Sequence, residues 1–282
     1  MCSTFKFQNI VGRNFDYDIS YKEELKIINQ DEFDNKYKIM GMGTGLVEDY
    51  PLLYDGMNEW GLCCSALAFE GNAIYNSFKF GNYINVPSFK VVFFILSEYA
   101  SVKELINDLN IWNISNEQYS DDFPNSDLHW FIADKERSII LEQTEDGLNY
   151  YDGEVMTNNP PYNIQERDYK VIKQYIGKND LENSQIYKTR GLETIFLTGD
   201  YTSMGRFERL SWLKEKLENS NCNFDKVSQS FHLLSCVEQI YGATPIKERF
   251  EYTIYSIIYD MNNLKCYVKR YDEINLEEGI IE

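Results

Sequence analysis

The chain opens with the residues on which its interpretation depends, Met1-Cys2-Ser3-Thr4-Phe5-Lys6-Phe7-Gln8-Asn9-Ile10-Val11-Gly12-Arg13-Asn14-Phe15-Asp16. The alternating apolar and polar pattern of Ser3 to Gln8 predicts a strand. Because the segment Gly12 to Asp16 follows closely, a hairpin return would carry Arg13 and Asp16 back alongside Cys2. The sequence therefore predicts a thiol, a guanidinium and a carboxylate at one place.

Cys2 offers a nucleophile that needs no histidine. When Met1 is excised, as is usual before a small second residue, the α-amino group of Cys2 becomes a base on the same residue as the thiol. An α-amino group has a reference pKa of about 7.7 to 8.0, close to the neutral range in which a general base works best. A nearby guanidinium favours the thiolate form of a cysteine. Cys2 alone is also compatible with a chance cysteine, but with Arg13 and Asp16 beside it these residues favour an N-terminal nucleophile whose base is its own amine.

Composition limits the possible partners. The chain has 282 residues, of which 43% are hydrophobic, and we expect a single domain over residues 1–282. No stretch approaches the roughly 18 to 20 uninterrupted apolar residues of a membrane span. The N-terminus lacks the basic and apolar regions of a secretory signal, which predicts a cytoplasmic protein. A formal charge of −18 argues against nucleic acid as a partner, and an anionic substrate would need a local cationic patch.

The cysteines and histidines point away from metal and triad chemistry. No CxxC motif and no histidine at metal-ligand spacing occurs, so no metal is predicted and the thiols should be free in a reducing compartment. A Ser-His-Asp or Cys-His triad would need His129 or His232, which are better explained as hydrogen-bonded core residues. The cysteines are Cys2, Cys63, Cys64, Cys222, Cys236 and Cys266, of which Cys63 and Cys64 are expected to pack within a strand.

Periodicity predicts an order of strands and helices. The predicted strands are Ser3 to Gln8, Tyr37 to Met42, Gly61 to Phe69, Leu128 to Ala133, Ser138 to Gln143, Tyr252 to Tyr259 and Leu264 to Tyr271. The predicted helices are Ser88 to Tyr99 after Pro87, Val102 to Asn110 with the capping box Ser101 and Glu104, Arg206 to Glu218 and Asp225 to Cys236. Loops are expected at Ser115 to Asp127 and Lys178 to Gln185. This order favours an α+β fold of stacked sheets covered by helices.

Further motifs carry a resemblance to a known family. After the opening segments come Asp55-Gly56-Met57-Asn58-Glu59 with Gly61-Leu62, Leu128-His129-Trp130, Met156-Thr157-Asn158-Asn159-Pro160, Gly199-Asp200-Tyr201 running into Arg206-Phe207, and Tyr252-Thr253. In this order and spacing the chain resembles, over nearly its whole length, the choloylglycine hydrolase family of conjugated bile salt hydrolases and penicillin V acylases. Asp55-Gly56 and Asn58-Glu59 are expected to be structural and receive no catalytic role.

The resemblance implies an α+β Ntn-hydrolase fold, a four-layer αββα sandwich with two central antiparallel sheets. It implies no metal or organic cofactor, no membrane partner, and a homo-oligomer, often a tetramer. The backbone N–H at Ala68 would serve the oxyanion hole. The other implied site residues are Cys2 as the nucleophile, Arg13 and Asp16 as the residues that position the thiol and the free amine, Asn158 as the side-chain oxyanion donor, and Arg206 as the remaining active-site arginine.

Plainer interpretations stay open for these residues. Arg13 and Asp16 are also compatible with a surface ion pair worth about 0 to 1 kcal/mol. The segment Asn158 to Pro161 is compatible with a simple turn, and Arg206 with an ordinary position in the first turn of a helix.

The chain departs from the family pattern at two places. Bile salt hydrolases tend to carry Asn, and penicillin V acylases Tyr, where this chain has Ala68. The backbone N–H is kept there, but a side-chain contact is lost. The connection from Cys2 to Arg13 is also shorter than in the family and should reshape a loop at the mouth of the pocket.

The leading hypothesis is hydrolysis of a linear, non-peptide amide between a bulky apolar acyl group and a small polar amine, through a thioester acyl-enzyme. A glycine- or taurine-conjugated bile acid is the first choice of substrate, and the aromatic composition suits a broad apolar pocket. Penicillin V or another N-acyl amide, such as an acyl-homoserine lactone, is the alternative among enzymes. A ligand-binding homologue that keeps the fold without activity is the alternative from another class.

Overall fold

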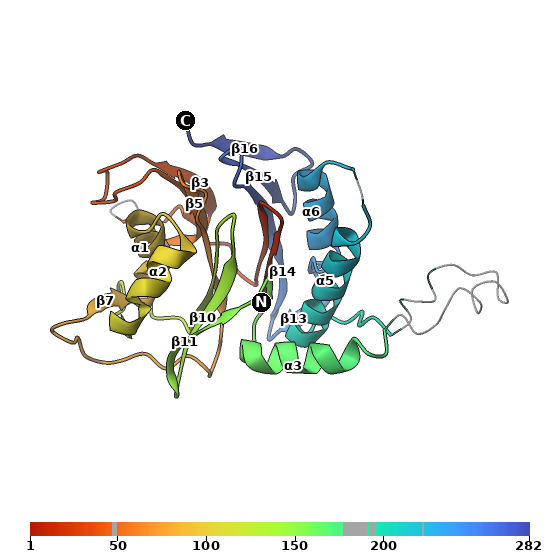
Figure 1. Ribbon diagram of the computed structural model, residues 1–282, viewed down its shortest axis with the longest axis horizontal. Coiled ribbons are helices and arrows are strands. Elements are labelled where there is room, and N and C mark those ends of the chain that lie inside the picture. Colours follow the sequence, from red (N-terminus) through yellow and green to blue (C-terminus); the bar gives the residue numbers. More distant parts are fainter. Residues whose placement is uncertain (47–49, 177–190, 192–193, 195, 222) are drawn as a thin grey trace.

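The structure is a computed structural model that describes all residues except 47–49, 177–190, 192–193, 195 and 222. The loop predicted at Lys178 to Gln185 and the thiol of Cys222 therefore lie outside the described residues. The described chain forms two large antiparallel sheets that face each other, with helices on both outer sides (Figure 1).

The first sheet contains the opening hairpin. Strand β1 (Cys2–Phe7) pairs with β2 (Ile10–Tyr17), and the register sets Cys2 opposite Phe15 and Thr4 opposite Arg13. The strand order is β12 (Val155–Met156), β1, β2, β14 (Arg249–Asp260), β15 (Lys265–Arg270) and β16 (Glu277–Ile280), and β13 (Thr244–Ile246) pairs with β14. The predicted hairpin is confirmed, and each of its strands also has an outer neighbour.

The second sheet supplies the opposite wall of the interior. Its order is β11 (Gly147–Asp152), β10 (Ser138–Thr144), β9 (Leu128–Ala133), β6 (Cys63–Ala68), β5 (Leu53–Asn58), β4 (Ile39–Thr44) and β3 (Glu23–Ile28). A separate parallel pair is formed by β7 (Ile84–Pro87) and β8 (Trp112–Ser115). Strand β6 contacts β1 of the first sheet, which brings the two walls together beside Cys2.

Helices cover the outer faces of both sheets (Figure 1). On the second sheet, α1 (Val91–Glu98) packs on β5 and β6 and is followed by α2 (Val102–Asp108). On the first sheet, α5 (Ser203–Glu218) contacts β1 and β12, and α6 (Lys226–Ser235) contacts β2 and β14, while α3 (Tyr162–Ile172) packs against α5. Short 3-10 turns, Ser88–Lys90 and Leu109–Ile111, flank α1 and α2. The predicted α+β fold with four αββα layers is confirmed.

The second sheet is buried on both faces, and the alternation along β9 shows how. Phe131 and Ala133 join the apolar cluster between the sheets, whereas Trp130 and Ile132 join the cluster that includes α1 and α2. Burial on both faces explains why this strand is nearly continuous in apolar residues. The exception is His129, a fully buried polar side chain in the same strand.

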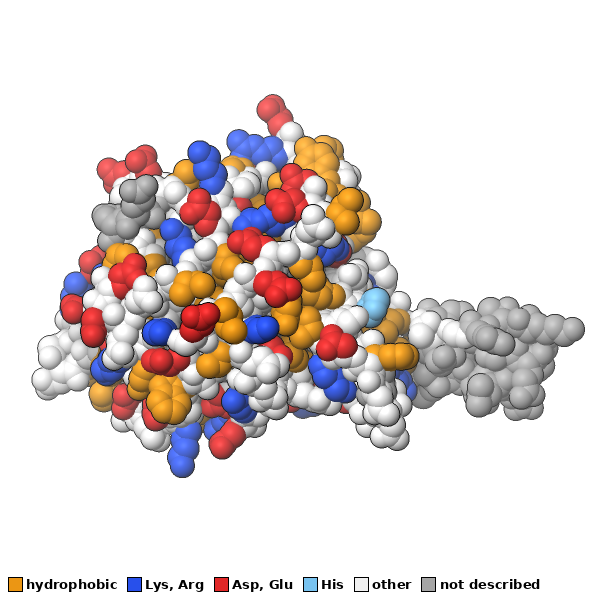
Figure 2. All heavy atoms as spheres, turned by 90° about the horizontal axis from the view of Figure 1, so that it is seen from above, with side chains coloured by type: hydrophobic (Ala, Val, Ile, Leu, Met, Phe, Trp, Pro, Cys, Tyr) orange, Lys and Arg blue, Asp and Glu red, His pale blue; other side chains and the backbone are white. Residues whose placement is uncertain are grey.

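The outer surface has a mixed character. Figure 2 shows acidic and basic side chains interspersed over one face, with apolar side chains between them. Among the described residues, no helix combines the length and the apolar character that crossing a membrane requires.

All predicted strands and helices correspond to elements of the structure, although several ends move. The strand predicted from Tyr37 begins at Ile39. Helix α5 begins at Ser203 rather than Arg206, because the Thr202 side chain accepts a hydrogen bond from Gly205 N–H and caps the helix. The predicted cap of α2 is confirmed, since the Ser101 side chain accepts from Glu104 N–H.

Some elements have no counterpart among the predicted strands and helices. Strands β3 and β11 lie at the two edges of the second sheet and are partly exposed, so their sequences lack a clear apolar pattern. Helix α3 is polar, with only Tyr162, Gln165 and Tyr169 buried. The loop expected at Ser115 to Asp127 is confirmed except for Ser115, which ends β8.

The packing between the sheets yields a stability prediction at Phe5. This side chain is fully buried in the cluster between the sheets. Phe5→Ala is expected to lower the free energy of unfolding by about 3 to 5 kcal/mol, because it leaves a cavity where relaxation is limited. Urea denaturation would measure the loss. Ile274→Ala, at a fully exposed side chain, should leave the midpoint unchanged, and equal effects of both variants would contradict the assignment.

Candidate active site

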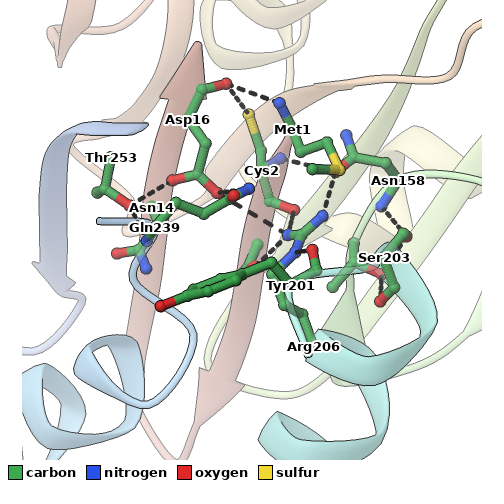
Figure 3. A network of polar contacts seen from close by, with 12 residues as sticks. Met1, Cys2, Asn14, Asp16, Asn158, Tyr201, Ser203, Arg206, Gln239 and Thr253 are labelled. Carbon is green, nitrogen blue, oxygen red and sulfur yellow. Dashed lines mark hydrogen bonds and ion pairs between the residues drawn. The ribbon is translucent and has the colours of Figure 1, made fainter. Parts of the chain in front are cut away.

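Cys2 stands at the start of β1 and is nearly buried, with 4% of its surface exposed. Its backbone N–H donates to Asn158 Oδ1 over 2.7 Å, and its carbonyl oxygen accepts from Arg206 Nη1 over 2.6 Å. The sulfur lies 3.9 Å from Arg13 Nη2 and 3.9 Å from the carbonyl oxygen of Asp16. Figure 3 shows Asp16, Asn158 and Arg206 arranged around this residue.

Arg13 presents a buried positive charge to the sulfur. Its Nη1 pairs with the Asp55 carboxylate, and its Nη2 donates to the carbonyl oxygen of Ala66 over 2.6 Å. Burial alone would lower the pKa of Arg13, but Tyr255, Asp55 and Cys2 outweigh this effect and raise the pKa above its ordinary value. The guanidinium is therefore held in its charged form beside the thiol, where a positive charge favours a negatively charged sulfur.

Asp55 anchors Arg13, a contact that the sequence analysis did not predict. Besides Arg13, the Asp55 carboxylate accepts hydrogen bonds from the hydroxyls of Tyr255, over 2.6 Å, and Tyr259. All four side chains are almost completely buried. Because Asp55 belongs to β5 and the tyrosines to β14, this cluster joins the two sheets behind the thiol. No local pattern could have revealed it, since its partners come from distant parts of the chain.

Asp16 is a fully buried carboxylate on β2. It accepts a hydrogen bond from Thr253 Oγ1 over 2.6 Å and from Gln239 Nε2 over 3.4 Å, and it lies 3.9 Å from Arg206 Nη1. Burial raises the pKa of Asp16, although Arg206, the chain terminus and the two hydrogen bonds oppose the rise. Since Asp16 and Arg13 are both buried and have separate partners, their interpretation as a surface ion pair is wrong.

The α-amino group of Met1 lies close to Asp16. It donates to the carbonyl oxygen of Asp16 over 2.9 Å and pairs with the carboxylate of Glu251. The Met1 side chain is 30% exposed, but its amino group is enclosed, and burial lowers the pKa of the amine despite the neighbouring Cys2 and Asp16. Glu251 and Thr253 alternate along β14, so one face of that strand lines the terminus.

Asn158 follows β12 and has a fixed amide orientation. Its Oδ1 accepts from Cys2 N–H over 2.7 Å and from Arg206 Nη2 over 2.9 Å, so its Nδ2 is the donor that reaches the carbonyl oxygen of Ala68 over 2.9 Å. Its backbone N–H donates to Ser203 Oγ over 2.9 Å. In a strand the N–H and C=O of one residue point to the same side. This geometry leads us to expect the N–H of Ala68 on the same side of β6 as its carbonyl oxygen.

Arg206 is fully buried in the first turns of α5. Its Nη1 donates to the Cys2 carbonyl oxygen and to Ser3 Oγ, each over 2.6 Å, and its Nε donates to the Tyr201 carbonyl oxygen over 3.1 Å. Burial lowers the pKa of Arg206, while Asp16 and Cys2 act in the opposite direction. These contacts exclude its interpretation as an ordinary helix position.

The structure brings all the sequence-predicted site residues together. Asn158 lies in the connection between β12 and α3, which agrees with its interpretation as part of a turn. Its side chain nevertheless contacts Cys2, so it is more than a turn residue. The contacts that the sequence analysis missed come from Asp55, Gln239, Glu251 and Thr253, which support the site from β5, β14 and the segment before β13. Cys63 and Cys64 are buried in β6, as predicted. His232 is exposed on α6, so its interpretation as a core residue is wrong.

Comparisons with known proteins agree on one family. The family model described as linear amide C–N hydrolases, choloylglycine hydrolase family, matches residues 1–279. The bile salt hydrolase/transferase of Lactiplantibacillus plantarum is 35% identical, with 96% of this chain and 90% of the relative covered. The bile salt hydrolase/transferase of Clostridium perfringens is 30% identical, with 88% and 81% covered.

Solved structures share the fold. A mutant of the conjugated bile acid hydrolase from Clostridium perfringens superposes with a TM-score of 0.88 at 26% identity and covers 100% of this chain and 92% of the other. The penicillin V acylase from Agrobacterium tumefaciens gives a TM-score of 0.73 at 18% identity, with 98% and 84% covered. At that identity the second likeness concerns the fold alone.

The Arg13–Asp55 pair predicts a large effect of Asp55→Asn on stability. Removing one partner of a buried ion pair typically costs about 3 to 5 kcal/mol, because the other charge remains buried without its counter-charge. Tyr259→Phe is the matched control, since it removes only one hydrogen bond to the same carboxylate and should cost about 1 to 3 kcal/mol. Urea unfolding at neutral pH measures both. A loss for Asp55→Asn no greater than for Tyr259→Phe would contradict the pairing.

Proposed function

The chain belongs to the choloylglycine hydrolase family of linear amide C–N hydrolases, and from this premise we propose that it deconjugates glycine- or taurine-conjugated bile acids. The observation that carries the proposal is the buried Cys2, whose backbone and sulfur contact Arg13, Asp16, Asn158 and Arg206. Two relatives that cover most of the chain at 30% identity or more are named as bile salt hydrolases/transferases.

The proposed nucleophile is the Cys2 thiol of a chain that has lost Met1. The free α-amino group of Cys2 then acts as the base that takes the thiol proton and returns it to the leaving amine. Burial lowers the pKa of the Met1 amine at the neighbouring position, and we expect the same desolvation to keep the Cys2 amine available as a neutral base. Arg13 stabilises negative charge on the attacking sulfur, and the carbonyl oxygen of Asp16, 3.9 Å from the sulfur, helps to position the thiol.

The proposed oxyanion hole consists of the Asn158 amide and the Ala68 backbone N–H. Attack on the amide carbonyl places negative charge on oxygen, and donors fixed in advance stabilise that charge. Arg206 fixes the orientation of the Asn158 amide by donating to Oδ1, which leaves Nδ2 facing the reaction space. The thioester formed on Cys2 is then hydrolysed by water that the same amine activates. These steps use only the chain's own groups.

The choice among linear amide substrates depends on the pocket around residue 68 as well as on the reaction type. Ala68 keeps the backbone donor but offers no side-chain contact to the substrate, in contrast to the Asn or Tyr expected for the two family branches. Penicillin V is the second candidate, because the fold is shared with a penicillin V acylase. We further propose one domain over residues 1–282 that acts in the cytoplasm as a homo-oligomer, a tetramer, on the strength of the family resemblance.

The nucleophile proposal predicts that Cys2→Ala abolishes amide hydrolysis and leaves the melting temperature nearly unchanged, because the sulfur acts chemically rather than in packing. Cys236→Ala, at an exposed cysteine, is the matched control and should retain full activity. Intact-mass spectrometry of the active protein is expected to find the chain without Met1. A fully active enzyme that retains Met1, or that has a blocked terminus, would refute the mechanism.

The substrate proposal predicts turnover of taurocholate or glycocholate at rates above that of penicillin V. Release of free taurine or glycine, and of 6-aminopenicillanic acid from penicillin V, would be measured side by side at equal substrate concentration. Hydrolysis of penicillin V alone would move the assignment to the other branch. Binding of all three compounds without any cleavage would favour the inactive, ligand-binding alternative.

A further inference from the structure

His129 lies between the two segments that carry the proposed oxyanion donors. It belongs to β9 and is completely buried. Its imidazole stacks on the ring of Phe69, with the ring centroids 4.4 Å apart and the planes inclined by 8°. Its Nε2 lies 2.8 Å from the carbonyl oxygen of Thr157. Phe69 directly follows Ala68, and Thr157 directly precedes Asn158, so one side chain contacts both neighbouring residues.

The partners of His129 determine where its protons lie. The Thr157 carbonyl can only accept, so Nε2 carries a proton and donates it. Nδ1 lies 3.1 Å from Glu142 Oε1, which already accepts the N–H of Tyr162 over 3.0 Å. Two acceptor atoms cannot bond each other, so a second proton must lie between Nδ1 and Glu142. The ring is therefore bonded at both nitrogens and cannot rotate without breaking two hydrogen bonds.

Glu142 fixes the ring to the rest of the scaffold. It is buried on β10, and its Oε1 joins His129 to the first residue of α3, Tyr162. Its second carboxylate oxygen is buried without a hydrogen-bond partner. Holding a buried carboxylate in this state is costly, and the proton shared with His129 offsets that cost. The pair is thus a rigid support rather than a solvated surface contact.

We propose that His129 is a positioning residue that holds the two oxyanion donors at their working distance, an inference that rests on the proposed function of Cys2, Asn158 and Ala68. The hydrogen bond to Thr157 fixes the backbone from which the Asn158 amide extends. The stacked Phe69 fixes the end of β6, where Ala68 presents its N–H. A histidine that merely satisfied its own hydrogen bonds in a core would have no such link to the reaction.

Other contacts hold the Asn158 segment from the opposite side. Ser203 Oγ accepts the N–H of Asn158, and the Gln165 side chain bonds to Thr157 Oγ1 and to the Asn158 carbonyl oxygen. Removing the His129 contact should therefore shift the amide rather than release it. Deleting an oxyanion donor outright typically lowers kcat by about 100- to 1,000-fold. A smaller loss is expected for a displaced donor.

Two substitutions of His129 separate its hydrogen bonds. In His129→Gln the amide nitrogen can occupy the place of Nε2 and keep the bond to Thr157, whereas in His129→Asn the shorter side chain can reach only Glu142. We expect kcat for taurocholate hydrolysis to fall about 10- to 100-fold in His129→Asn and less than about fivefold in His129→Gln. KM should change less than about threefold in both. His232→Asn, at the exposed histidine of α6, is the matched control and should behave as wild type.

The rate at which iodoacetamide alkylates Cys2 distinguishes a displaced oxyanion donor from a general structural defect, because a general defect would also change this rate. Alkylation needs the thiol but builds no oxyanion, so its rate in His129→Asn should stay within about twofold of wild type while amide hydrolysis falls. Unchanged kcat in His129→Asn overturns the proposal. Equal losses of alkylation, hydrolysis and melting temperature also overturn it, because they would mark His129 as a core residue only.

If His129→Asn does not fold, Glu142→Gln carries the test. The amide oxygen keeps an acceptor for Tyr162 N–H, but the neutral side chain no longer holds the second proton of the imidazole. We expect kcat at least about threefold lower with unchanged Cys2 alkylation, and wild-type kcat would overturn the proposal. Failure of the substrate assignment is distinguishable, since wild type would then cleave another linear amide, on which the same comparison is made. A wild-type chain that cleaves no linear amide would refute both.

Discussion

Two buried pairings of guanidinium and carboxylate on either side of Cys2 constrain the rest of the structure. Arg13 pairs with Asp55, and Arg206 faces Asp16 while it holds the backbone carbonyl of Cys2. Charges removed from water destabilise a fold unless each finds a partner in good geometry. These charges therefore find their partners only when three features form together. They are the register of the β1–β2 hairpin, the cluster around Asp55 that joins the sheets, and the start of α5.

Burying these charges has a cost in free energy at the site itself. Burial raises the pKa of Asp16 and lowers the pKa of Arg206, so desolvation works against the charged form of both groups. Hydrogen bonds from Thr253 and Gln239 reduce this penalty for Asp16. Functional sites commonly keep such unfavourable burial because the reaction needs the charges, and the surrounding core compensates for it. Here the apolar cluster between the sheets provides the compensation.

The parts of this site that the sequence could predict are those encoded locally. The alternation of apolar and polar residues predicts β1. The short connection after it predicts that Arg13 and Asp16 return to Cys2, which the hairpin register confirms. Asn158 and Arg206 came from motif resemblance, since nothing in their neighbourhood points to the N-terminus. The grouping of strands and helices along the chain predicts stacked sheets covered by helices, because that arrangement buries their apolar faces. The αββα order of the layers follows only from the family resemblance.

The parts that could not be predicted depend on pairings between distant segments. The sequence predicts a structural role for Asp55, but its contact with Arg13 becomes visible only when β5 and β14 face each other. The sequence predicts His129 to be a hydrogen-bonded core residue, and its burial and its two bonded nitrogens confirm this. The pattern of β9 could not predict which groups bond to this histidine. Strand pairing positions Glu142, and the connection after β12 positions Thr157.

The orientation of Asn158 shows how one amide can be fixed by these distant groups together. An amide that can flip would present its oxygen to a developing oxyanion half of the time and repel it. Here Oδ1 receives hydrogen bonds from Cys2 N–H and from Arg206. The Arg206 guanidinium can only donate, so a flip would place the NH2 group against this donor. Nδ2 therefore donates to the carbonyl oxygen of Ala68, and in the proposed mechanism its second hydrogen serves the substrate. The contact at Ala68 uses backbone atoms. The presence of alanine in place of a larger side chain therefore leaves the position of the Asn158 amide unchanged and alters only the space beside it.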